Sequence, residues 1–193
     1  MDNQFFSMLS RMKLINRWGL MRNTMNENIS EHSINVAIIA HALAVIRNTY
    51  FDGKINAERA ALLGIYHDAA EIITGDLPTP VKYFNPELRT AYKQVEEQAA
   101  AKLLSMLPRG LQETYASLLT PSEEDYEIWT LVKAADKISA LIKCVEERVT
   151  GNRDFIKAER AALKAVKDMC IMEADYFIEA FMPSFEKTID EQT

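Results

Sequence analysis

The sequence of 193 residues contains few of the residues that break helices, with only six glycines and six prolines. Alanine, leucine, glutamate and lysine are plentiful, and no stretch of useful length alternates as a strand does. A hydrophobic share of 48% beside 26% charged residues is typical of a globular protein, and we find no repeats or low-complexity segments. The composition therefore predicts an all-α fold formed as one domain over residues 1–193.

Cysteine is equally scarce, because only Cys144 and Cys170 occur and they lie far apart in the chain. Such usage argues against a disulfide and is typical of a reducing compartment. The first residues lack the basic region of a signal peptide, and we expect no apolar run of membrane-spanning length. These absences predict a soluble cytoplasmic protein without a membrane partner.

Positive charge is not in excess, since 22 lysines and arginines face 28 aspartates and glutamates, for a net charge of -6. A partner as long as DNA or RNA needs a basic surface, and no such block is evident. Small anionic ligands remain possible, because one or two well-placed cations are enough to bind them.

Apolar residues recur at helical spacing through most of the chain. Asn28 or Ser30 can cap one helix, Asn56 can cap the next, and Gly75 can end it. The predicted helices cover 5–12, 31–47, 57–74, 86–106, 111–119, 123–148 and 158–181.

The predicted helix that follows Asn56 contains Tyr66–Glu71, with the sequence YHDAAE. Adjacent His67 and Asp68 can both reach a point above the shoulder of the helix, where imidazole and carboxylate would bind a divalent metal. Glu71 projects one turn further along the same side, which would suit a proton-transfer residue that is not a ligand. The alternative is a capped core histidine beside a solvated acid.

Two other helices each carry one further inward ligand candidate. His32 lies on the apolar stripe at a helix N-terminus, where the helix dipole favours neutral imidazole, whereas His41 points away. Asp136 lies among apolar neighbours, which is costly unless it is paired or bound to a metal. Each alone is more often a hydrogen-bonded core residue, but with His67 and Asp68 they favour a His2Asp2 site for cobalt, manganese, iron or zinc.

Two loops could hold a substrate beside this site. Arg17 and Trp18 lie in a loop where Gly19 permits a turn, and could present a guanidinium beside an aromatic wall. Alternatively, Trp18 covers a core edge and Arg17 is solvated. The second loop is Asp76–Pro80, which its prolines should keep extended and stiff. A plain helix terminator would give no reason for Asp76.

The order His…His-Asp…Asp resembles the HD-domain phosphohydrolases. Local strings narrow the likeness to the bacterial HD-domain 5′-deoxynucleotidases, and it runs from about Phe5 to about Phe185. The strings are Leu14–Trp18, Asn28–Ser33, Tyr66–Glu71, Thr74–Tyr83 and Lys133–Asp136. The His-Asp core is shared by the whole superfamily, whereas Arg17-Trp18 together with the sequence GDLPTP is far more specific.

This resemblance implies an HD-domain helical bundle with a metal site between core helices. The enzyme would hydrolyse 2′-deoxyribonucleoside 5′-monophosphates, select against ribonucleotides and act as a homodimer. One divalent ion per subunit is implied, with cobalt favoured and manganese, copper or zinc possible. The implied metal ligands are His32, His67, Asp68 and Asp136.

The resemblance also assigns roles in catalysis and substrate binding. Glu71 would act as general acid or base, Arg17 would orient the phosphate, and Trp18 would crowd the sugar 2′ position. Asp76 would accept a hydrogen bond from the 3′-hydroxyl. The remaining residues that the resemblance assigns to the substrate site are Leu77, Pro78 and Thr79, together with the metal ligands His32, Asp68 and Asp136. The resemblance also implies a catalytic role for Asp68.

Two rival functions stay open. One is another HD-domain hydrolase, acting on cyclic nucleotides, nucleoside triphosphates or alarmones. A dinuclear phosphodiesterase would need more histidines than the remaining His41, and a triphosphatase would need more cations than Arg17 and Lys82. The other rival is a non-catalytic nucleotide-binding or scaffold module, which would have no use for the acid at Glu71.

Overall fold

The computed structural model describes residues 3–82, 84–120 and 122–192, so Tyr83 of the Thr74–Tyr83 string and both ends of the predicted domain lie outside the described residues. Within these ranges the chain forms helices and no strand, apart from one isolated antiparallel bridge between Asn16 and Asn28. The predicted all-α class is confirmed.

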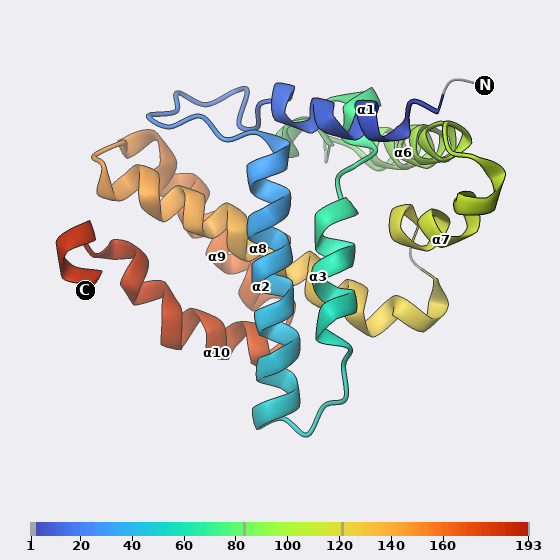
Figure 1. The fold of residues 1–193 in the computed structure, drawn as a ribbon. Helices are drawn as coiled ribbons and strands as arrows, with labels where there is room; N and C mark the ends of the chain where they lie inside the picture. The colour runs from blue at the N-terminus through green and yellow to red at the C-terminus, as the bar shows by residue number, and fades with distance from the viewer. Residues whose placement is uncertain (1–2, 83, 121, 193) are drawn as a thin grey trace.

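The helices follow one another along the chain with short 3₁₀ helices between some of them (Figure 1). The α-helices are α1 (Phe5–Leu9), α2 (Ile29–Tyr50), α3 (Ala57–Tyr66), α4 (Glu71–Thr74), α5 (Thr79–Lys82), α6 (Pro86–Ser105), α7 (Arg109–Leu119), α8 (Tyr126–Val149), α9 (Ile156–Lys167) and α10 (Met172–Phe181). The 3₁₀ helices are η1 (Ser10–Leu14), η2 (Glu123–Asp125), η3 (Arg153–Phe155), η4 (Met182–Glu186) and η5 (Ile189–Gln192).

Helix α2 occupies the centre of the molecule and packs against α3, α8 and α10 (Figure 1). It begins with a capping box, because Asn28 accepts a hydrogen bond from the Glu31 amide and Glu31 accepts one from the Asn28 amide. Contrary to expectation, α2 is long and apolar enough to cross a membrane, with a mean hydropathy of 1.5. However, 56% of that apolar window is buried inside the fold, which is the pattern of a core helix.

Helices α2 and α3 approach each other closely at Gly64. A Cβ atom on Gly64 would lie 2.7 Å from the Cα atom and 2.9 Å from the backbone nitrogen of Ala37. Real side chains do not approach a backbone this closely, so only glycine permits the observed spacing. Gly64 therefore sets the distance between α2, which carries His32, and α3, which leads directly into the turn that holds His67.

The predicted helix over 57–74 is broken, because α3 ends at Tyr66 and α4 begins at Glu71. The Nδ1 atom of His67 lies 2.8 Å from the Gly64 carbonyl oxygen, which a continuous helix would offer to the Asp68 amide. The amides of Ala69 and Glu71 then bond to carbonyls three residues back. The His-Asp pair thus lies in a tight 3₁₀-like turn between two helices, and not within one helix.

The predicted helix over 158–181 is also broken, between α9 and α10. Cys170 lies in this break with φ of +54°, a left-handed conformation that an α-helix cannot contain. Cys170 is exposed and Cys144 is buried, and both are free thiols, as the sequence predicted.

Candidate metal and substrate site

Three segments bring the predicted metal ligands together. His32 comes from the first turn of α2, His67 and Asp68 from the turn after α3, and Asp136 from α8. The Nε2 atom of His32 lies 3.1 Å from Asp136 Oδ1 and 3.5 Å from Asp68 Oδ2. The Nε2 atom of His67 lies 3.1 Å from the same Asp68 oxygen. One ligand atom each from His32, His67 and Asp68 can lie within 4.8 Å of one another, a spacing that could hold a metal ion.

The other nitrogen of each imidazole is anchored by the fold. His67 Nδ1 must carry a proton, because its partner is the Gly64 carbonyl, which only accepts. His32 Nδ1 lies 3.2 Å from the Ser139 hydroxyl. Both Nε2 atoms are buried and have no hydrogen-bond partner within the described ranges. Such anchoring is typical of metal-binding histidines, so the donor set fits a divalent cation.

The charges in this cluster are strongly coupled. Burial together with the Arg17 guanidinium lowers the pKa of His32. Burial opposes the charge on His67, but the neighbouring Asp68 raises the His67 pKa overall. Burial likewise opposes ionisation of both aspartates, yet His67 lowers the pKa of Asp68 to about 2, and His32 lowers that of Asp136 further. Both carboxylates are therefore ionised at neutral pH, as metal ligands must be.

The pKa of Glu71 is shifted in the opposite direction to those of Asp68 and Asp136. In the 3₁₀-like turn, residues three apart eclipse each other, so Glu71 lies in line with Asp68. Its side chain is buried, and its Oε2 atom has no hydrogen-bond partner in the described part of the chain. Burial, followed by the charges of Asp68 and Asp76, raises the pKa of Glu71 to about 9. This carboxyl group is protonated at neutral pH and can donate a proton.

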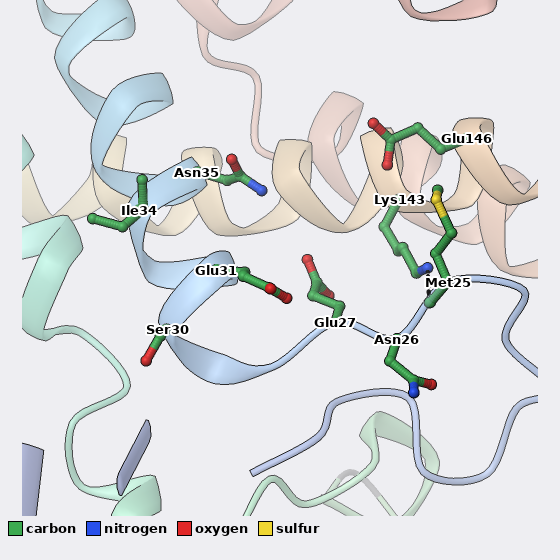
Figure 2. A pocket seen from close by; sticks show the side chains of 9 residues that line it. All are labelled: Met25, Asn26, Glu27, Ser30, Glu31, Ile34, Asn35, Lys143 and Glu146. Carbon is green, nitrogen blue, oxygen red and sulfur yellow. Dashed lines mark hydrogen bonds between the residues drawn. The ribbon is translucent and has the colours of Figure 1, made fainter. Parts of the chain in front are cut away.

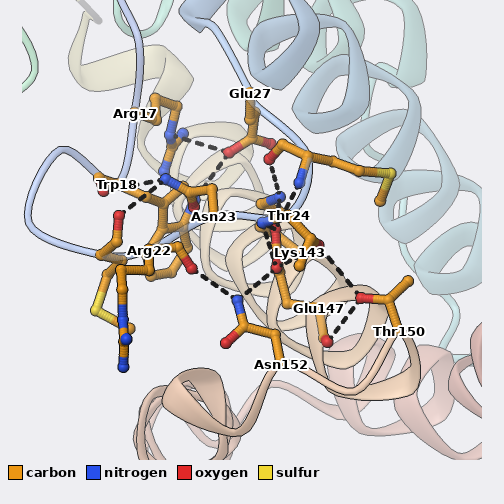
Figure 3. Close-up of polar contacts among 12 residues, drawn as sticks. Arg17, Trp18, Arg22, Asn23, Thr24, Glu27, Lys143, Glu147, Thr150 and Asn152 are labelled. Atoms are coloured by element: carbon orange, nitrogen blue, oxygen red, sulfur yellow. Dashed lines mark hydrogen bonds and ion pairs between the residues drawn. The ribbon is translucent and has the colours of Figure 1, made fainter.

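Arg17 and Trp18 converge on a residue that the sequence did not single out, Glu27. One carboxylate oxygen of Glu27, Oε2, accepts a hydrogen bond of 2.9 Å from the Trp18 indole and lies 3.4 Å from Arg17 Nε (Figure 3). Burial opposes the charge on Arg17, but the charges of Asp136 and Glu27 raise the pKa of Arg17 overall. Arg17 therefore interacts electrostatically with the metal cluster. The left-handed residue in this loop is Trp18, with φ of +60°, and not Gly19.

The second predicted substrate loop follows Gly75, whose φ of +76° ends α4. Asp76, Leu77 and Pro78 are half-buried and non-helical, but α5 begins at Thr79, so the loop is shorter than the predicted extended segment. A proline in the first turn of a helix costs little, because its missing amide would have no partner there.

The charge of Asp76 is coupled to the same cluster. Burial raises the pKa of Asp76, and the Arg17 guanidinium partly offsets this rise. Lys82, at the end of α5, forms a 2.7 Å ion pair with Glu96 and lies 5.0 Å from the centre of the Tyr92 ring. Its ammonium group is therefore held by α6.

Solved structures with a similar fold define the class of protein. An HD-domain phosphohydrolase of Listeria innocua is 25% identical with a TM-score of 0.80, and the match covers 94% of this chain and 88% of that one. The cyanophage S-2L HD phosphohydrolase DatZ, bound to dA and one catalytic Zn²⁺ ion, is 21% identical with a TM-score of 0.67, covering 94% and 96%. The fold is that of the HD-domain phosphohydrolases.

Sequence comparison identifies the family within this class. Residues 4–185 match the family described as 5′-deoxynucleotidase YfbR-like. Curated relatives named 5′-deoxynucleotidase from Photorhabdus laumondii and Yersinia pestis are each 51% identical, over 98% of this chain and 96% of theirs. The chain belongs to the YfbR-like 5′-deoxynucleotidase family and is a hydrolase, which confirms the resemblance drawn from the sequence.

Proposed function

We propose that this protein is a metal-dependent phosphomonoesterase that converts 2′-deoxyribonucleoside 5′-monophosphates to deoxynucleosides and phosphate, and that it selects against ribonucleotides. The observation that carries the proposal is the convergence of two unpartnered imidazole nitrogens, among the described residues, with two ionised carboxylates next to a protonated Glu71. Membership of the YfbR-like family supports the substrate class. We further propose one domain over residues 1–193, a cytoplasmic location and a homodimer.

The proposed metal site uses all four converging side chains, one ion per subunit. When bound, a divalent ion would neutralise phosphate charge and lower the pKa of a coordinated water from 15.7 towards about 7. We favour cobalt, with manganese, copper or zinc as alternatives; the fold relative DatZ binds zinc. The proposed ligands are His32, His67, Asp68 and Asp136.

The proposed substrate contacts surround this cluster. Arg17 would orient the phosphate, because its guanidinium is buried and its Nη1 atom has no hydrogen-bond partner within residues 3–82, 84–120 and 122–192. Trp18 would crowd a 2′-hydroxyl, and Asp76 would accept a hydrogen bond from the 3′-hydroxyl. Leu77, Pro78 and Thr79 would complete the sugar pocket.

Glu71 would supply the proton that the reaction requires. Hydrolysis breaks the bond between phosphorus and the 5′-oxygen, joins the water oxygen to phosphorus and leaves an alkoxide that must be protonated. Because the raised pKa keeps Glu71 protonated at neutral pH, it can give its proton to the 5′-oxygen. A module that only bound nucleotides would gain nothing from this buried acid.

Phosphate release from dAMP and AMP tests the proposal. Metal-stripped protein would be assayed after adding cobalt, manganese, copper, zinc or magnesium in turn. We expect activity on dAMP that depends on the added metal, with little activity on AMP. Equal rates on both nucleotides would overturn the selectivity, and full activity without metal would overturn the metal dependence. Activity on neither monophosphate, with metal still bound, would favour a different phosphoester or a binding role.

A further inference from the structure

We propose that Glu27 is a positioning residue that couples phosphate binding to sugar selectivity. This inference rests on the proposed function, because it concerns how Arg17 and Trp18 are held beside the metal cluster. Glu27 is buried, with 8% of its surface exposed, at the end of the loop that leads into α2. Neither the family comparison nor the sequence pattern assigns it a role.

A single oxygen atom of Glu27 contacts both substrate residues (Figure 3). Its Oε2 atom lies 2.9 Å from the Trp18 indole nitrogen and 3.4 Å from Arg17 Nε. The backbone reinforces this contact, because the Glu27 carbonyl accepts a 2.9 Å hydrogen bond from the Arg17 amide. A movement of this carboxylate would therefore displace both side chains together.

The contact with Arg17 determines which face of the guanidinium remains available. Glu27 lies on the Nε side in an ion pair of 3.4 Å, and both Arg17 Nε and Arg17 Nη1 are buried without a hydrogen-bond partner within the described residues. The guanidinium is planar and its donors have fixed directions, so a negative charge beside Nε favours an orientation in which the terminal nitrogens point away from Glu27. The charges of Asp136 and Asp68 also act on Arg17, so the guanidinium lies close enough to the metal cluster to feel its charge.

The contact with Trp18 holds a strained residue. Trp18 has φ of +60°, a left-handed conformation that bulky residues rarely adopt. Its indole N–H donates to Glu27, and the centre of its ring system lies 5.3 Å from the centre of the Phe155 ring. These two contacts fix the indole against rotation, so its orientation depends on Glu27.

The chain that leads to Glu27 is held by a buried polar network on α8. Lys143 Nζ donates a 2.6 Å hydrogen bond to the Met25 carbonyl, and Glu147 accepts bonds of 2.9 and 2.6 Å from the Thr24 amide and hydroxyl. This network fixes the chain two residues before Glu27. On its other side Glu27 lines a pocket of about 570 Å³ that Lys143 also lines, so a smaller side chain can be accommodated (Figure 2).

Two substitutions separate the effects of charge and hydrogen bonding. Glu27→Gln retains an acceptor for the Trp18 indole but loses the charge opposite Arg17. We expect its KM for dAMP to rise about tenfold, with kcat and the dAMP/AMP preference within twofold of wild type. Glu27→Ala loses both contacts, so its dAMP/AMP preference should also narrow about tenfold. The matched control is Glu146→Gln, which removes another carboxylate from the same pocket and should leave all values unchanged.

The indole N–H resonance of Trp18 provides a second measurement that is independent of activity. The chain has two tryptophans, and Trp129→Phe would identify the Trp18 signal. We expect this signal to move upfield in Glu27→Ala and to stay in place in Glu27→Gln. An unmoved signal, or a Glu27→Ala enzyme with wild-type selectivity, would overturn the proposal. Failure of the wild-type protein to hydrolyse dAMP would instead refute the proposed function, while the indole signal would still report whether Glu27 holds Trp18.

Discussion

At the scale of single residues, two carboxyl groups three positions apart have opposite ionisation states. Asp68 lies beside His67, which lowers its pKa to about 2, whereas burial raises that of Glu71 to about 9. One turn of chain thus holds an ionised carboxylate suited to bind a cation and a neutral one suited to donate a proton. Environments that separate the pKa values of neighbouring acids are typical of hydrolytic sites.

We predict that Glu71→Gln abolishes most turnover without abolishing binding. The amide has nearly the same shape but cannot donate a proton to the 5′-oxygen, so kcat should fall by about 10²–10⁴-fold. Calorimetric titration with deoxynucleoside should give a dissociation constant within a few-fold of wild type. An exposed acid provides the control, because Glu97→Gln should change neither value. A normal kcat for Glu71→Gln would exclude the proposed role.

The raised pKa of Glu71 also predicts how stability depends on pH in the metal-free protein. Between the ordinary carboxyl pKa and about 9, the folded state holds a proton that the unfolded state has lost. The free energy of unfolding should therefore fall as pH rises through this range. Glu71→Gln lacks this proton, so urea denaturation should find it increasingly more stable than wild type from pH 5 to 9. A constant difference across this range would mean that the Glu71 pKa is ordinary.

Trp18→Ala should narrow the preference for deoxyribonucleotides. Removing the indole opens space at the sugar 2′ position. The ratio of kcat/KM for dAMP to kcat/KM for AMP should therefore fall by about tenfold or more. Gly19→Ala is the neighbouring control, because a Cβ atom there meets nothing within 4 Å among the residues that the structure describes. An unchanged dAMP/AMP ratio in Trp18→Ala would exclude a steric role for this side chain.

The residue types in the cluster could be predicted because an acid or a histidine stands out beside the apolar residues of a helix. His32, His67 and Asp136 were identified in this way, and the structure brings them together. Glu27 could not be found by such reasoning. It becomes important only when the chain around Asn16 pairs with the chain around Asn28, and that pairing leaves no periodic signal.

At the scale of elements, apolar periodicity predicted where helices form but not where they break. At the break after Tyr66 the His67 ring bonds to the Gly64 carbonyl and the backbone changes to bonds three residues back, and at the break near Cys170 one residue is left-handed. Neither event changes the apolar pattern, so both were predicted as continuous helix. The close approach of α2 and α3 could not be predicted either, because nothing in the sequence shows that Gly64 packs against Ala37.

We predict that Gly64→Ala destabilises the protein and weakens metal binding together. The added methyl group would collide with the Ala37 backbone and force α2 from α3, at a cost of about 1–3 kcal/mol in the free energy of unfolding. His32 and His67 would then move apart, so the dissociation constant for cobalt should rise. Chemical denaturation and metal titration would measure the two effects.

Gly110→Ala, in α7, is the control for this prediction. A Cβ atom on Gly110 meets nothing within 4 Å in the described part of the chain, and alanine favours helices more than glycine does. This variant should be as stable as wild type or slightly more stable, with unchanged metal binding. Equal behaviour of the two variants would show that the spacing at Gly64 does not matter.

At the scale of the whole molecule, the N-terminal loop is joined to α8 through Lys143 and Glu147, which form a buried ion pair within α8 and bond to Met25 and Thr24 of the loop. Glu147 is fully buried and accepts hydrogen bonds from Lys143, Thr24 and Asn152. Burial opposes its ionisation, but these donors hold the pKa of Glu147 far below the ordinary value. Patterns within single helices could not predict this contact, since it joins segments more than a hundred residues apart.

We predict that Glu147→Gln lowers the free energy of unfolding at pH 7 by about 3–5 kcal/mol, because it leaves the buried Lys143 without its counter-charge. A depressed carboxyl pKa contributes stability above its unfolded value, and this contribution is lost as pH falls below it. The difference between variant and wild type should therefore shrink below about pH 4.5. Thermal unfolding from pH 7 to 3 would test this. A difference that stays constant across the range would contradict it.

The apolar length of α2 has a consequence for the protein during its synthesis. Ribosomes add about 5–20 residues per second. Residues 51–149 are made between the end of α2 and the end of α8. Helix α8 is therefore complete roughly 5–20 seconds after α2. In that interval a helix apolar enough to cross a bilayer has much of its core face uncovered. Chaperones and membrane surfaces would then compete with folding, and expressed fragments that end before α8 should aggregate or become associated with membranes.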